Sequence, residues 1–408
     1  VIFVLFQVAM PKFTILQTLI DRLNLVSREI LTGIPVIRAF SREKHEEDRF
    51  EKANLDLTKT NLFVNRCMTF MMPIMMLIMN GVSVLIIYSG AHAVDNGTMQ
   101  VGNVMAFIQY AMQIIMSFLM ITAMSIMLPR ANVAALRIDE VLKTEVSIQD
   151  PETPVHPSES VKGEIEFDHV SFAYPEAGEN VLTDISFKAK KGQTIAVIGS
   201  TGSGKSTLIN LIPRYYDVTK GSVKVDGVDV RDMTQKELRD KLGYVPQKGV
   251  LFSGTIDSNI RYGKPEITDA QVKEAAEVAQ ATEFIDTKPE KYESPVSQGG
   301  TNVSGGQKQR LSIARAIAKD PEIFIFDDSF SALDFKTDSQ LRKALKEYTK
   351  DATTVIVAQR ISTILGADQI IVLDDGHMAG IGTHKELMAN CEVYQQIARS
   401  QLSEEELA

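Results

Sequence analysis

Two long stretches of the chain contain no Asp, Glu, Lys or Arg. The first runs from Cys67 to Val94 and the second from Asn96 to Pro129. Because an α-helix rises about 1.5 Å per residue, each stretch is longer than the roughly 30 Å hydrocarbon layer of a bilayer. The pattern predicts membrane helices at about 67–93 and 99–129. The alternative is a buried helical hairpin in a soluble protein.

The residues that flank these stretches predict their orientation. Segment 12–66 mixes charged and apolar positions, which is typical of long helices that extend from the membrane into water. The connection at 94–98 contains an Asn-Gly turn pair and no Lys or Arg, whereas both outer flanks are rich in them. Because basic residues accumulate on the cytoplasmic side, we expect segment 12–66 to be an intracellular loop and everything after Arg130 to be cytoplasmic.

The chain opens on an apolar run, residues 1–11, that is too short to span a bilayer. We interpret this run as the tail of a helix whose first part precedes the sequence, so that residues 1–140 form an N-terminally truncated, partial transmembrane domain. Segment 141–164 is polar and contains three prolines, which predicts a linker.

From about 165 to 400, short apolar strands alternate with helical stretches. This alternation predicts a parallel sheet covered by helices. The expected strands include Glu164–Phe167, Thr194–Ile198, Ile323–Phe326 and Thr353–Ala358. Residues 401–408 are expected to form an acidic tail.

Charge and cysteine content exclude some classes of function. The 408 residues carry a formal net charge of -9, which argues against a nucleic-acid partner because phosphate backbones require local Lys and Arg excess. Two cysteines, Cys67 and Cys391, lie far apart in segments of opposite character. Neither a disulfide framework nor a cysteine metal cluster is therefore expected.

Directly after the expected strand at 194–198 comes a nine-residue segment whose first eight residues fit the pattern GxxxxGK[ST]. The nine are Gly199, Ser200, Thr201, Gly202, Ser203, Gly204, Lys205, Ser206 and Thr207. Glycines let successive backbone N–H groups turn toward phosphate oxygens, and the following helix points its positive end at them. We expect this loop to bind ATP, with Lys205 at the terminal phosphates and Ser206 as a ligand of Mg²⁺.

A second candidate lies at the end of the expected strand Ile323–Phe326. This apolar run places Asp327 and Asp328 at the edge of the sheet. A carboxylate there can hold Mg²⁺ beside the phosphate loop, directly or through water. Alone, a strand that ends in two acids is weak support for such a site.

Two further motifs complete an ordered set. Ser304, Gly305, Gly306 and Gln307 lie between the phosphate loop and the acidic strand, and Ser331-Ala332-Leu333-Asp334 follows that strand. This order resembles the nucleotide-binding domain of ABC transporters over essentially all of residues 165–400. The resemblance implies an α-helical transmembrane domain followed by an α/β P-loop NTPase domain with a helical subdomain.

The resemblance also implies roles for individual residues. Tyr174 is similar to the aromatic residue that stacks on adenine, although a core tyrosine is the alternative. Gln247 resembles the glutamine that senses Mg²⁺ and the attacking water. The Ser304–Gln307 segment resembles the signature that binds ATP held by the opposite subunit, and Asp334 resembles the acid that communicates across that interface. Two such domains would sandwich two ATP molecules.

The membrane part resembles exporters more loosely. Gly33, the Arg38-Ala39-Phe40 stretch, two final helices and a fused nucleotide domain follow the order of a half-transporter. The resemblance implies a short coupling helix near residues 20–32.

Three positions depart from the family pattern. Asp328 stands where glutamate usually acts as general base, Gln359 stands where histidine is usual, and Gln298 stands where exporters often have glutamate. The side chain of Asp328 is one methylene shorter than that of glutamate, and the amide of Gln359 cannot relay protons as histidine does. These departures indicate an ATP site that binds well and hydrolyses slowly, as in the degenerate-site subunit of heterodimeric bacterial-type exporters.

The resulting hypothesis is an ATPase that exports a hydrophobic or amphipathic substrate, acting with a second and different half-transporter. It would reside in the plasma (inner) membrane, surrounded by lipid, with a cytoplasmic nucleotide-binding domain. Most of the 17 methionines lie in the two membrane stretches; their pliable side chains suit varied drug-like or lipid-like molecules, or ordinary lipid-facing packing. The alternatives are an ATP-binding regulatory subunit with negligible hydrolysis at its own site, and a homodimeric lipid or drug exporter in which Asp328 is an adequate base.

Overall fold

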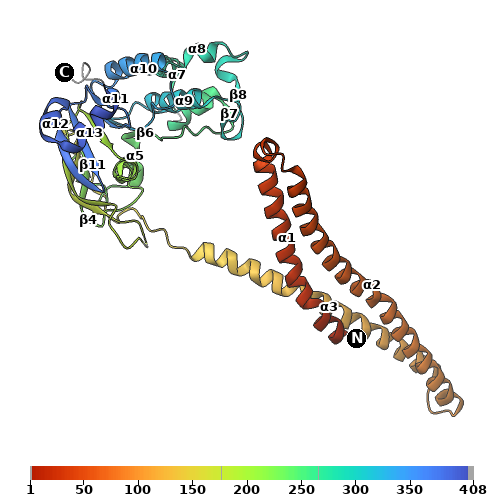
Figure 1. Cartoon of the computed structure of the whole chain (residues 1–408). Helices are drawn as coiled ribbons and strands as arrows, with labels where there is room; N and C mark the ends of the chain where they lie inside the picture. The colour runs from red at the N-terminus through yellow and green to blue at the C-terminus, as the bar shows by residue number, and fades with distance from the viewer. Residues whose placement is uncertain (1, 176, 265, 403–408) are drawn as a thin grey trace. The chain divides into compact units, whose positions relative to one another are not determined.

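The chain divides into two compact units, Val1–Glu145 and Val146–Ala408. The computed structural model describes residues 2–175, 177–264 and 266–402 (Figure 1). Helices alone form the first unit, and sheets covered by helices form the second. The elements of both units agree with the predicted fold class.

Three long helices make up the first unit: α1 (Ile2–Ala39), α2 (Glu43–Asp95) and α3 (Val101–Lys143). Helices α1 and α2 run side by side and are joined by a tight turn (Figure 1). Val26, Ala53 and Val64 are buried where the two helices pack. An ion pair between Arg49 and Glu29 adds a polar link along the same pair. The long helices expected in segment 12–66 are therefore present as the paired arms of α1 and α2.

The predicted short helix near residues 20–32 is wrong. These residues lie in the middle of α1, which continues through Gly33 and Pro35 as far as Ala39. The chain reverses only afterwards, where Ser41 adopts a left-handed backbone with φ of 50°. Packing against α2 holds the helix past the two residues that normally break one.

Helices α2 and α3 contain the apolar stretches of the sequence. Among the described residues, α2 and the Val101–Ile121 part of α3 are long and apolar enough to cross a membrane. Few of their side chains are buried within the chain, as expected for surfaces that contact lipid or other helices. The Asn-Gly pair lies in the turn between them, with Gly97 at φ 71°. Helix α3 extends to Lys143, so the first residues of the predicted linker are helical.

A six-stranded sheet forms the centre of the second unit, in the order β12-β11-β3-β10-β9-β6. Its neighbours are parallel except for the antiparallel β11–β12 pair. The strands are β3 (Thr194–Gly199), β6 (Leu242–Val245), β9 (Ile323–Asp327), β10 (Thr353–Val357), β11 (Gln369–Asp374) and β12 (His377–Gly382). Every residue of β9 is buried, as expected for a strand covered on both faces.

A second, antiparallel sheet has the order β2-β1-β4-β5. Its strands are β1 (Ile165–Phe172), β2 (Leu182–Ala189), β4 (Lys220–Val225) and β5 (Val228–Asp229), and a small ladder pairs β7 (Gly254–Thr255) with β8 (Pro295–Val296). Side chains of β1, β2 and β4 join those of β3 and α4 in one apolar core. This sheet therefore supports the loop that follows β3.

Short and medium helices surround the sheets. They are α4 (Lys205–Leu211), α5 (Gln235–Asp240), α6 (Ile256–Ile260), α7 (Asp269–Val278), α8 (Thr282–Asp286), α9 (Gly305–Ala318), α10 (Phe335–Tyr348), α11 (Ile361–Ile364), α12 (His384–Asn390) and α13 (Glu392–Gln401), with 3₁₀ turns at Arg261–Gly263, Lys291–Glu293 and Gln298–Gly300. Helices α6 to α9 share a separate apolar cluster that corresponds to the predicted helical subdomain. Helix α13 includes Gln401, which the sequence had placed in the acidic tail.

Candidate nucleotide-binding and hydrolysis site

The predicted phosphate loop joins the end of β3 to the start of α4. Gly202 and Gly204 have φ values of 87° and 95°, a left-handed conformation that other residues rarely adopt. A Cβ atom on Gly204 would lie 2.8 Å from the side chain of Leu182 in β2. Gly204 is therefore required by both backbone conformation and available space, and Gly202 by backbone conformation.

Lys205 extends back across this loop. Its Nζ donates to the carbonyl oxygen of Gly199 at 2.9 Å and to that of Ser200 at 2.6 Å, and lies 3.4 Å from Ser203 Oγ. Burial lowers the pKa of Lys205, while the carboxylates of Asp328 and Asp327 oppose that shift. The ammonium group is thus held at the centre of the loop, where phosphate oxygens of ATP would bind.

Ser206 and Asp327 form the candidate Mg²⁺ site. Ser206 Oγ donates to Asp327 Oδ1 at 3.1 Å, which joins the start of α4 to the end of β9. Burial raises the pKa of Asp327, the bond from Ser206 lowers it, and the adjacent Asp328 raises it again. A hydroxyl and a carboxylate oxygen are donors that suit Mg²⁺.

These residues fit a metal that is shared with substrate phosphates. No group of three or more His, Cys, Asp or Glu suited to a metal occurs among the described residues, and Mg²⁺ is commonly held by one or two protein ligands together with phosphate oxygens. The third predicted ligand, Gln247, bonds to Asp328 instead. The structure thus brings Ser206 and Asp327 together and places Gln247 beside them at a different carboxylate.

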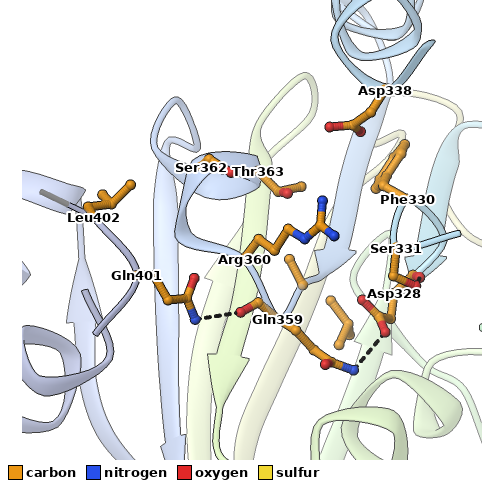
Figure 2. A pocket seen from close by; sticks show the side chains of 12 residues that line it. Asp328, Phe330, Ser331, Asp338, Gln359, Arg360, Ser362, Thr363, Gln401 and Leu402 are labelled. Carbon is orange, nitrogen blue, oxygen red and sulfur yellow. Dashed lines mark hydrogen bonds between the residues drawn. The ribbon is translucent and has the colours of Figure 1, made fainter. Parts of the chain in front are cut away.

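Asp328 is the point at which the three predicted catalytic residues meet. Its Oδ2 accepts a hydrogen bond of 2.7 Å from Gln359 Nε2 (Figure 2). It also accepts one of 3.3 Å from Gln247 Nε2. The residue is 7% exposed and has a left-handed backbone with φ of 46°. Its own N–H donates to Val357 O at the end of β10. Loops after β6, β9 and β10 therefore converge on one carboxylate.

A cavity of about 450 Å³ lies beside this carboxylate. Figure 2 shows Asp328 and Gln359 on its wall together with Gln401, which reaches in from α13. Gln401 was not among the predicted site residues. No pattern in the sequence distinguishes it from the other glutamines of α13, because its role depends on which face of that helix is buried.

The predicted signature begins helix α9. Ser304 caps the helix by accepting from Gln307 N, and Gln307 Oε1 accepts from Ser304 N in return. A Cβ on Gly306 would lie 3.2 Å from the carbonyl oxygen of Ala332, whereas the space beside Gly305 is open. Ser304 and Gly305 are exposed. The segment is thus rigid and presents its backbone to solvent, while its action on a partner's ATP stays a prediction.

Asp334 begins helix α10 in the same way. Its side chain accepts from Thr337 N at 3.0 Å, and this backbone hydrogen bond lowers the pKa of Asp334. The residue is exposed and ionised, and its contact with a second subunit stays a prediction.

Tyr174 lies at the edge of the core near the phosphate loop. Its hydroxyl bonds to Thr207 Oγ1 at 3.0 Å, and its ring meets Phe172 and Tyr216 at 4.9 Å and 5.1 Å in edge-to-face contacts. The half-buried ring combines features of a core tyrosine with proximity to the nucleotide loop. Its stacking on adenine stays a prediction.

Comparisons with known proteins find matches in both units of the chain. The family model of the ABC transporter transmembrane region matches residues 1–118, and the ABC transporter model matches residues 182–331. The uncharacterized ABC transporter ATP-binding protein Rv1273c of Mycobacterium tuberculosis is 46% identical over 395 residues, which are 96% of this chain and 68% of the relative. The uncharacterized ABC transporter ATP-binding protein YfiB of Bacillus subtilis is 42% identical, also over 96% of this chain and 68% of the relative.

Two further similarities concern export. YgaD of Bacillus subtilis, which its name assigns provisionally to multidrug export as an ATP-binding/permease protein, is 39% identical over 88% of this chain and 62% of the relative. The solved structure of a bacterial Atm1-family ABC exporter with ATP bound matches with a TM-score of 0.82 and 28% identity, over 99% of this chain and 71% of that one. The predicted fold class and ATPase activity are confirmed. The chain belongs to the ABC transporters and is an exporter-type half-transporter, in which a helical transmembrane region precedes the domain that binds and hydrolyses ATP.

Proposed function

We propose that this half-transporter pairs with a different half-transporter and that its own ATP site is the slower of the two. The pair would use ATP to export a hydrophobic or amphipathic substrate. The observation that carries the proposal is the environment of Asp328, whose short carboxylate is engaged by two side-chain amides, from Gln359 and Gln247.

A general base must be held with a lone pair directed at water, and the proton that it takes must be passed on. Amide groups donate hydrogen bonds to Asp328 but cannot accept and release a proton as imidazole does. The carboxylate is also nearly buried, and one methylene fewer keeps it close to the strand end. The complete phosphate loop with Lys205 supports tight ATP binding, so binding without rapid hydrolysis is the expected behaviour.

The intact signature supports a working second site. Ser304 and Gln307 form a complete capping box, and the exposed backbone at Gly305 remains accessible to a nucleotide held by another chain. This chain would therefore contribute to hydrolysis at its partner's phosphate loop even when its own site is slow. That asymmetry favours a heterodimer over a silent regulatory subunit.

Mg²⁺ would be held by Ser206 and Asp327, where it would supply positive charge to the phosphate oxygens. We place Gln247 nearby as a residue that orients Asp328. We also propose the plasma membrane as the location, since the relatives described above are bacterial proteins.

The substrate class is inferred from the surface of the membrane helices. Met76, Met120 and Met124 are each at least 60% exposed, and flexible thioether side chains adapt to hydrophobic molecules of varied shape. The export function in the name of YgaD is consistent with such substrates.

ATP turnover by the full-length chain in lipid tests the proposal, first alone and then mixed with candidate partner half-transporters. Lys205→Ala in this chain provides the background control, because it removes the ammonium group from the phosphate loop. Slow turnover alone and rapid turnover with a partner are expected. Rapid turnover alone would show a homodimer with a competent Asp328, and slow turnover with every partner would show a regulatory subunit.

A further inference from the structure

The last turn of α13 contacts the loop that carries Gln359. Gln401 Nε2 donates to the carbonyl oxygen of Gln359 at 2.8 Å, and Gln401 Oε1 accepts from Ile361 N at 2.8 Å. Figure 2 shows the first of these bonds at the backbone of Gln359, and the bond from the Gln359 side chain to Asp328 at its other end. A single side-chain amide thus pairs with two backbone groups of the loop.

These bonds satisfy a backbone group that the loop cannot satisfy itself. Helix α11 begins at Ile361, and Arg360 at its N-cap makes no side-chain capping bond. The first N–H groups of a helix have no acceptor within that helix. Gln401 supplies the acceptor from 40 residues further along the chain.

Core packing of α13 determines where Gln401 lies. Tyr394 and Ala398 are fully buried, and Gln401 follows them at a helical spacing that keeps all three on neighbouring positions of one face. The Tyr394 hydroxyl also bonds to His384 Nδ1 of α12 at 2.8 Å. The side chain of Gln401 therefore extends from a fixed surface toward the loop.

The loop is held from its other side by α10. Arg342 Nη1 donates to the carbonyl oxygen of Ser362 at 2.8 Å. Three backbone groups between Gln359 and Ser362 are thus bonded to side chains of two different helices. The side chain of Gln359 donates its hydrogen bond to Asp328.

We propose that Gln401 is a positioning residue for ATP hydrolysis, which holds the backbone at Gln359 and Ile361 so that the Gln359 amide stays on Asp328. The inference rests on the roles proposed above for Asp328 and Gln359 at the chain's own ATP site. Without Gln401, the loop would sample orientations in which Gln359 leaves Asp328, and the carboxylate would lose its fixed direction. ATP binding at Lys205 would persist, because the phosphate loop makes none of these contacts.

Single-turnover hydrolysis of labelled ATP by the full-length chain in lipid, with protein in excess, measures the effect. Gln401→Ala is expected to lower the rate constant about fivefold, the ratio that corresponds to losing about one net hydrogen bond. Its affinity for ATP, measured in a separate equilibrium binding assay, should be unchanged. Gln401→Asn keeps the amide but shortens its reach, and is expected to show a similar loss. Gln396→Ala is the matched control, since this exposed glutamine of α13 bonds to Glu392 on the same helix and should leave the rate unchanged when replaced.

A double-mutant cycle with Gln359→Ala identifies the route of the effect. If Gln401 acts through Gln359, Gln401→Ala has no further effect on the rate in the Gln359→Ala background. An equal fivefold loss in both backgrounds, an unchanged or faster rate for Gln401→Ala, or weaker equilibrium binding of ATP by Gln401→Ala would each overturn the proposal. Rapid turnover of the unmodified chain alone would contradict the proposal that its own ATP site is slow. The ratio of rate constants between Gln401→Ala and the unmodified chain could still be measured and interpreted.

Discussion

Asp328 has one methylene fewer than the glutamate usual at this position of the family, and Asp328→Glu tests whether that difference limits hydrolysis. In the structure Asp328 Oδ2 lies 2.7 Å from Gln359 Nε2, and the residue is only 7% exposed. The added bond moves the carboxylate outward by up to about 1.5 Å. We therefore expect the longer side chain to reach the attacking water better.

The expected size of the change follows from two opposing effects. Misplacement of a reacting group by about 1 Å can cost on the order of a hundredfold in rate, so correct placement of the carboxylate would regain a factor of that size. The same movement breaks the hydrogen bond from Gln359, which contributes about 1 kcal/mol, or about fivefold. The single-turnover rate constant of Asp328→Glu should therefore rise about twentyfold.

The substitution also affects folding, and a control separates the two consequences. Asp328 has a left-handed backbone, a conformation that aspartate tolerates better than glutamate, so a loss of about 1 kcal/mol in stability is expected. Asp320 precedes β9 on the surface with φ of 53°, and Asp320→Glu makes the same change in the same backbone conformation. It should lower the melting temperature in the same way and leave the rate unchanged.

Single-turnover hydrolysis of labelled ATP in lipid, measured alongside equilibrium ATP binding, decides the outcome. A rate for Asp328→Glu that is equal to or below that of the unmodified chain, with normal ATP binding, would refute the reasoning. The slow step would then lie outside the position of the base.

Three other changes give expected outcomes. Lys205→Met should weaken ATP binding at least tenfold in an equilibrium binding assay, because the ammonium group at Gly199 O and Ser200 O is removed. Lys241→Met should cost about 3 kcal/mol of stability in thermal unfolding, because the fully buried side chain of Asp226 loses the ammonium group that lies 2.9 Å away. The double variant with Asp226→Asn should regain part of that stability. Burial, and to a lesser extent Lys385, lowers the pKa of His384 in the folded chain. The contribution of neutral His384 to stability is therefore present above the unfolded pKa of about 6.5, and it is lost as the pH falls through the lower pKa of the folded chain. The melting temperature should therefore fall more steeply between pH 7.5 and 5.5 for the unmodified chain than for His384→Gln.

Local sequence was sufficient for those parts of the site that depend on neighbouring residues. The phosphate loop needs glycines at Gly202 and Gly204 because of the backbone itself, and the run Ile323–Phe326 is apolar because β9 is buried on both faces. Such requirements restrict which residue types can occupy these positions, so they can be recognised in the sequence. Both the loop and the strand were predicted where they occur.

The parts that sequence reasoning missed depend on contacts between distant segments. Helix α1 continues past Gly33 and Pro35 because α2 packs along it. The chain then reverses at Ser41, which adopts a left-handed conformation that a sequence analysis would expect at a glycine. Gln401 reaches the loop at Gln359 only because other residues of α13 are buried. Neither feature could be inferred from residues close in the sequence.

Helix α10 connects the residue expected at the partner interface with the hydrolysis site. Asp334 caps its first turn through Thr337 N, and Arg342 further along bonds to both Asp338 Oδ2 and Ser362 O at 2.8 Å. If α10 moved as a rigid body, a displacement of its N-terminus would also move Arg342, which bonds to the loop that carries Gln359. Because α13 holds the same loop from its other side, the orientation of Gln359 depends on the relative position of two helices, of which only α10 begins at the predicted interface.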